Sequence, residues 1–111
     1  MQRDRLLLTE IVDACERIIE LLAGRNVADV EANRDVRDAL LWNYTVLGEA
    51  ASKVSERLKD AHPSVPWNDP VRLRNRIVHG YWAVELDILA STAEQDLPEM
   101  LAAVRRITEE L

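Results

Sequence analysis

The chain has no phenylalanine, one cysteine, three glycines and two histidines among its 111 residues. One cysteine cannot form an internal disulfide, and two distant histidines do not complete a zinc-binding pattern with it. No apolar run approaches the roughly 20 residues needed to cross a bilayer. The opening MQRDRLLLTE has charge on both sides of its apolar run, unlike a secretory leader. We therefore expect a soluble protein of the reducing cytoplasm.

An excess of basic charge is also absent. The chain carries 20 Asp and Glu against 14 Lys and Arg, a net charge of −6. Proteins that coat nucleic acid nonspecifically neutralise many phosphates with a broad basic surface, so this class is excluded. Any contact with nucleic acid must be local.

The residues that are abundant favour helices. Leucine, alanine, glutamate and arginine suit helices better than a pleated sheet. The length fits one compact domain with a modest core and is too short for two ordinary domains. Residues 1–111 are therefore expected to form a single all-α domain.

Apolar residues recur every three or four positions along three stretches of the chain. They predict a first helix over residues 3–23, a long central helix over 35–61 and a closing helix over 86–111. Gly48 would cost the central helix about 1 kcal/mol relative to alanine unless another backbone approaches it closely. Pro98 should bend the closing helix or make it restart.

The connections between these helices contain turn and cap residues. RNVADVEANRD has room for a short helical turn, with Asn26 or Asn33 as candidate caps. HPSVPWNDP, with its three prolines, is a clear break before the next segment. Together with a helix in that segment, the pattern predicts an antiparallel four-helix bundle with a short extra helix.

The segment RLRNRIVHGYW, residues 72–82, is basic and aromatic without one acidic side chain. VRLRNRIV alternates apolar and basic residues, which also fits a strand. No second strand exists to pair with it, so its backbone donors would stay unsatisfied. A helix that starts after the Asn68–Asp69–Pro70 cap and ends at Gly80 is the better interpretation.

On such a helix, Asn75 and His79 share one face, while Arg74 and His79 lie about 140° apart around the axis. Arg74 and His79 could therefore reach one substrate under either of two conditions. Either the last turn of the helix tightens, or a second copy of the chain contributes its own Arg74 and His79 across a symmetric cleft.

Arg74, His79 and Tyr81 form an Arg-x4-His-x-Tyr pattern that resembles the motif of the HepT-like branch of the HEPN superfamily. This branch contains toxins paired with a minimal nucleotidyltransferase antitoxin. PW at 66–67, LGEAASKVSE in the central helix and DLPEM in the closing helix are similar to that family in order and spacing. The resemblance covers essentially the whole chain.

The resemblance implies an all-helical HEPN bundle that homodimerises, with both motifs lining a shared groove. It implies metal-independent ribonuclease activity, and no cofactor is expected. It also implies that the nucleotidyltransferase partner neutralises the toxin. In some members of the family this partner transfers AMP to the motif tyrosine, here Tyr81. Relatives often carry Ile-Gly-Met before the Arg-Asn pair, where this chain has Val71-Arg72-Leu73. Arg72 thus replaces a glycine and adds a charge that could bind phosphate.

RNA can be cut without a metal when a base removes the 2′-OH proton, an acid protonates the leaving 5′ oxygen and cations stabilise the phosphorane. His79 could act as base or acid, because an unperturbed histidine has a pKa of about 6.5, and two copies could divide these roles. Arg74 stays protonated and presents a planar fork of donors to a phosphate. Asn75 could orient the imidazole or the substrate, and Tyr81 could stack on a base.

A purely structural interpretation competes with this one. In it, Arg74 and Arg76 pair with acids such as Glu49, and His79 only finishes a helix. The resemblance favours catalysis for Arg74 and His79 and leaves Arg76 as an auxiliary contact, with Glu49 as an anchor for a motif arginine. The sequence thus predicts a homodimeric endoribonuclease toxin. The alternative is a catalytically inactive HEPN module that binds RNA, nucleotide or its nucleotidyltransferase partner.

Overall fold

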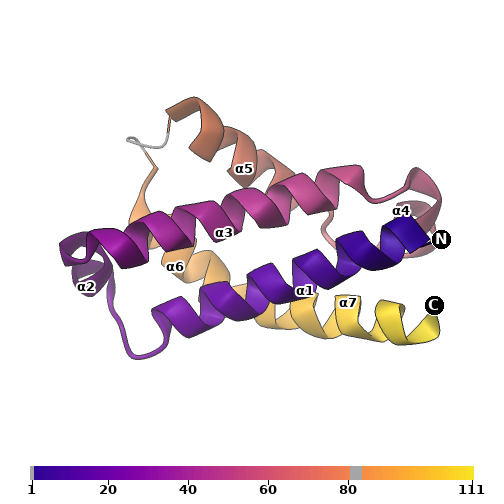
Figure 1. Ribbon diagram of the computed structural model, residues 1–111, viewed down its shortest axis with the longest axis horizontal. Helices are drawn as coiled ribbons and strands as arrows, with labels where there is room; N and C mark the ends of the chain where they lie inside the picture. Colours follow the sequence, from indigo (N-terminus) through magenta and orange to yellow (C-terminus); the bar gives the residue numbers. More distant parts are fainter. Residues whose placement is uncertain (1, 81–83) are drawn as a thin grey trace.

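Seven α-helices and no strand make up the part of the chain that the computed structural model describes, residues 2–80 and 84–111. In chain order they are α1 (Gln2–Leu22), α2 (Val27–Ala32), α3 (Arg34–Lys53), α4 (Glu56–Ala61), α5 (Asn68–Gly80), α6 (Leu86–Gln95) and α7 (Leu97–Glu110). α1 and α3 run side by side in opposite directions, and α1 begins at the end of the molecule where α7 finishes (Figure 1). The prediction of an all-α HEPN-type bundle is confirmed.

The core lies between α1, α3, α6 and α7, where apolar side chains at helical spacing meet. The largest fully buried side chains of these four helices are Leu8, Ile11 and Ile18 of α1, Leu40, Tyr44 and Leu47 of α3, Leu89 of α6 and Val104 of α7. The Tyr44 hydroxyl donates a hydrogen bond of 2.6 Å to the Leu89 carbonyl, which ties α3 to α6. Among the described residues, no helix is both long enough and apolar enough to cross a membrane.

The central helix is shorter than predicted. The periodicity predicted one helix over residues 35–61, but α3 ends at Lys53 and α4 begins at Glu56. Ser55 makes the break, because its hydroxyl caps α4 by accepting from the Leu58 amide at 3.2 Å. Its amide and hydroxyl also donate to the two carboxylate oxygens of Asp4, at 2.9 and 2.6 Å. These bonds hold the backbone out of helical geometry at this position.

Both predicted asparagine caps are present. Asn26 forms a capping box with Asp29 at the start of α2, and the Asn33 side chain caps α3. The closing helix is two helices, since α6 ends at Gln95 and α7 begins at Leu97, so Pro98 lies in a first helical turn. The interpretation of a restart is confirmed, although the Asp96 side chain makes no capping hydrogen bond.

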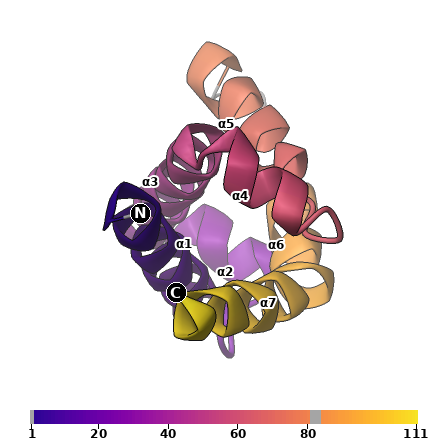
Figure 2. The same cartoon turned by 90° about the vertical axis from the view of Figure 1, so that its right-hand side faces the viewer.

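α5 lies at the edge of the bundle, contributes Ile77 to the core and packs on α3, with no other helix in comparable contact within the described residues (Figure 2). Its contact with α3 centres on Gly48, where an added Cβ would lie 2.2 Å from the Arg74 Cβ and 2.5 Å from the Pro70 carbonyl oxygen. The expected close approach at Gly48 is therefore confirmed. Asn68 and Asp69 were expected as caps but lie inside α5, which begins at Asn68 because Pro70 is compatible with a first turn.

Candidate active site on helix α5

Arg74 is held by an ion pair with α3 and a hydrogen bond within α5. Its Nη2 lies 3.1 Å from Oε2 of Glu49, and its Nη1 donates to Oδ1 of Asn75 at 2.8 Å. The Arg74 side chain is 31% exposed, and its buried Nε has no hydrogen-bond partner among the described residues. The guanidinium is thus fixed in place while part of it stays accessible to a ligand.

Glu49 is shared between two cations. Lys53 Nζ lies 3.0 Å from Oε1 of Glu49, on the other side of the carboxylate from Arg74. The hydrogen bond and charge of Lys53, and then the charge of Arg74, lower the pKa of the Glu49 carboxyl. Glu49 therefore remains ionised at neutral pH and can orient the guanidinium of Arg74, the contact that the structural interpretation of the sequence foresaw.

His79 lies in the last turn of α5 and is exposed to solvent. α5 stays α-helical to Gly80, so the last turn does not tighten, and Arg74 and His79 point about 140° apart around its axis. Asn75 is exposed on the face that neighbours His79. One chain alone does not aim the guanidinium and the imidazole at a common phosphate. Tyr81 lies outside the described residues.

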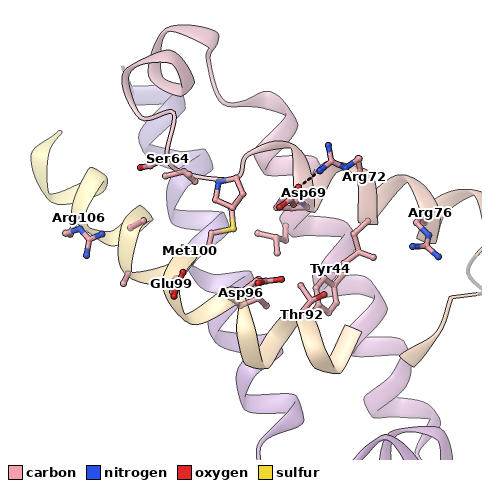
Figure 3. Close-up of a pocket in the computed structure, with 18 residues that line it drawn as sticks. Tyr44, Ser64, Asp69, Arg72, Arg76, Thr92, Asp96, Glu99, Met100 and Arg106 are labelled. Carbon is pink, nitrogen blue, oxygen red and sulfur yellow. Dashed lines mark hydrogen bonds and ion pairs between the residues drawn. The ribbon is translucent and has the colours of Figure 1, made fainter. Parts of the chain in front are cut away.

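Arg72 and Arg76 lie on the exposed side of α5. Arg72 forms an ion pair with Asp69, one turn earlier in the helix. Arg76 has no acidic partner among the described residues. Both arginines line a cavity between α5 and the α6–α7 pair (Figure 3). The sequence indicated these arginines but not the cavity. The walls of the cavity come from segments far apart in the chain, so no local sequence pattern predicts it.

Two exposed apolar side chains lie on the helices that carry the Arg74–Glu49 pair. Trp42 is 66% exposed and precedes Glu49 by seven residues, which places both on one face of α3. Val78 is 48% exposed and follows Arg74 by four residues on α5. We call this surface the Trp42–Val78 face. Trp42 therefore does not belong to the core of the chain.

Cys15 takes no part in the site. It is fully buried in α1, and burial raises the pKa of its thiol to about 12, with a smaller contribution from the charge of Glu16. A neutral buried thiol is a poor nucleophile. Cys15 is therefore a core residue and not a catalytic nucleophile.

The bundle and the α5 segment together define a HEPN-type helical protein. Residues 11–107 match the family described as "Ribonuclease HepT-like". The chain belongs to this family.

Among curated relatives, the chain is 27% identical to a "Probable ribonuclease HepT" of Thermococcus cleftensis, with 84% of each chain covered. It is 26% identical to a putative RNase of Caldanaerobacter subterraneus subsp. tengcongensis, with 96% of each chain covered. A putative RNase of Methanocaldococcus jannaschii is 24% identical over 86% of this chain and 88% of its own length. No solved structure matches the chain significantly.

Proposed function

We propose that this chain is a metal-independent endoribonuclease in which Arg74 and His79 carry the chemistry. One observation carries the proposal: an arginine anchored by Glu49 and Asn75 shares a short helix with a solvent-exposed histidine. Membership in a ribonuclease family supports it. A guanidinium that is oriented but still accessible is suited to a phosphate whose charge grows in the transition state.

The proposed reaction needs no group beyond these side chains and the RNA. Neutral His79 of one copy removes the 2′-OH proton, and the 2′ oxygen attacks the phosphorus. The P–O5′ bond breaks as protonated His79 of the second copy donates a proton to the leaving 5′ oxygen. The products are a 2′,3′-cyclic phosphate and a 5′-OH. Arg74 binds the phosphate throughout the reaction.

A homodimer would bring these groups together. The Trp42–Val78 face exposes a tryptophan and a valine next to Arg74, and buried aromatic anchors are typical of protein interfaces. Around the axis of α5, Val78 lies between Arg74 and His79, about 40° from the first and 100° from the second. A two-fold contact at this face would therefore place Arg74 and His79 of both copies along the two sides of one groove. Trp42→Lys should then yield monomers by light scattering. Leu6→Glu, at an exposed leucine of α1, should leave the dimer intact.

The direct test of catalysis is RNA cleavage in the presence of EDTA. The wild-type chain should cut single-stranded RNA, and Arg74→Ala and His79→Ala should each lower the rate by about 100-fold or more. Arg57→Ala, at an exposed arginine of α4, is the control and should leave the rate unchanged. A wild type that cuts no RNA, even when freshly separated from any partner and unmodified, would instead identify a binding module.

We further propose that the chain is a toxin that a minimal nucleotidyltransferase neutralises by transferring AMP to Tyr81. An added phosphate two residues from His79 would place negative charge beside the proposed site and repel RNA. Co-expression with such a partner should increase the mass of the chain by AMP units, and Tyr81→Phe should abolish the increase. Full neutralisation at unchanged mass would mean that the partner inhibits by steric binding.

A further inference from the structure

A cavity of about 720 Å³ opens between α5 and the α6–α7 pair (Figure 3). It exists because α5 packs on α3 and stands away from the closing helices. The loop before α5 forms another wall, which buried Trp67 holds in place by donating from Nε1 to the His62 carbonyl at 3.0 Å. The volume lies within the range of about 300–1,000 Å³ that is typical of small-ligand sites.

The lining of the cavity combines an apolar floor with charged walls. Leu47, Leu97 and Met100 line it and are buried, which suits one flat face of an aromatic ligand. Arg76 and Arg106 lie toward opposite ends (Figure 3) and have no acidic partner among the described residues. Two such arginines would attract phosphate groups.

The cavity is also lined by a carboxylate, that of Asp96, which has no ion-pair partner among the described residues. Asp96 stands at the N-cap of α7 and is exposed, and its side chain makes no capping bond and receives no hydrogen bond from any described residue. Figure 3 shows it in the middle of the cavity, between Met100 and Tyr44. Glu99 adds a second carboxylate at the wall, whereas Asp69 is neutralised by Arg72. Because the lining offers both arginines and carboxylates, the fitting ligand carries both phosphate groups and N–H donors.

These features select one class of nucleotide. Among the four RNA bases, only guanine presents two adjacent N–H donors on its Watson–Crick edge, which match the two oxygens of one carboxylate. Uracil flanks its single N–H with two carbonyl oxygens, and adenine and cytosine place an acceptor nitrogen beside the amino group. Asp96 would therefore favour guanine, while the apolar floor covers the ring of the base.

The cavity borders the helix that carries the candidate active site, and Arg72 and Arg76 of α5 line it, whereas Arg74 and His79 do not. Arg72 and His79 are seven residues apart on α5, about 20° around the axis, and Arg76 lies between them along the helix. An RNA strand held at His79 would pass Arg76 on its way to the cavity. We propose that the cavity binds a guanine nucleotide of the RNA next to the scissile phosphate. That this nucleotide is part of an RNA substrate rests on the proposed function.

The test uses the full chain and measures binding, not cleavage. Titration calorimetry should show that 5′-GMP binds about ten-fold more tightly than 5′-UMP or 5′-AMP. Asp96→Asn should remove this preference, and the matched control Glu94→Gln, at an exposed residue of α6 outside the cavity, should retain it. Arg106→Gln should weaken the binding of all three nucleotides by about ten-fold, because it removes a phosphate contact.

A blocking substitution provides the second readout. Ala102 is exposed and lines the cavity, so Ala102→Trp should fill it without disturbing the core and should abolish 5′-GMP binding. Absent 5′-GMP binding, equal affinity for the three nucleotides or binding that survives Ala102→Trp would each overturn the proposal. A chain that binds 5′-GMP in this pattern but cuts no RNA would refute only the proposed ribonuclease activity. A chain that cuts RNA without binding 5′-GMP would refute only the guanine site.

Discussion

Gly48 and Glu49, adjacent on α3, determine where Arg74 lies. Gly48 lets the backbone of α5 come close enough for Arg74 to reach across, and Glu49 then fixes the guanidinium. The sequence indicated both residues, since a glycine in mid-helix needs a close neighbour and Glu49 of the central helix was a candidate anchor for a motif arginine. It could not tell whether pairing excludes function, because only the structure shows that the paired arginine keeps part of its surface exposed.

Gly48→Ala should destabilise the fold, although alanine is the better helix former. The added Cβ would overlap the Arg74 Cβ and the Pro70 carbonyl, so α5 must shift, at a cost of roughly 1–3 kcal/mol. Gly80→Ala is the matched control, because a Cβ there meets nothing within 4 Å. Urea denaturation should show a lower free energy of unfolding for the first variant alone. Equal stability of both variants would show that the α3–α5 contact is looser than described.

Among the elements, the helices built from local patterns were predicted best. α1 and the turn at α2 follow from their periodicity and their caps, and the restart before α7 follows from Pro98. The break between α3 and α4 could not be predicted, because it depends on Asp4, which lies 51 residues away from Ser55 in sequence. The cavity beside α5 was missed for the same reason.

The bond between Asp4 and Ser55 makes stability depend on pH. Burial acts to raise the pKa of the Asp4 carboxyl, but the hydrogen bonds from the Ser55 side chain and backbone outweigh it and lower the pKa. The folded pKa is therefore below the unfolded value of about 3.9. The stabilisation is present above that pH and is lost as pH falls through the folded pKa.

Asp4→Asn should thus lower the free energy of unfolding at pH 7 by about 1–2 kcal/mol. The difference from wild type should shrink as the pH is lowered below 4, because the wild-type carboxyl then becomes protonated as well. Asp13→Asn, at an exposed position of α1, serves as the control. Urea denaturation at fixed protein concentration measures the free energy of unfolding of each variant and of wild type. A difference between Asp4→Asn and wild type that stays unchanged at low pH would contradict this role for Asp4.

For the whole molecule, the distribution of charge matters more than its sum. The net charge is −6, yet α5 carries three arginines and a histidine, with Arg74 on its α3 side and the other two on its exposed side. This arrangement supports local contact with RNA rather than general attraction. Because Arg74 and His79 diverge within one chain, the account depends on two chains forming one catalytic groove.

The decisive measurement is the activity of a mixed dimer. Two differently tagged chains, one wild type and one His79→Ala, are co-expressed, and the mixed dimer is isolated through both tags. A single groove that uses both histidines predicts RNA cleavage as low as that of the His79→Ala homodimer, whereas a mixed dimer of wild type and Arg57→Ala should be fully active. A wild type/His79→Ala dimer that retains half of the wild-type rate would show that each chain holds a complete site, and would contradict the account.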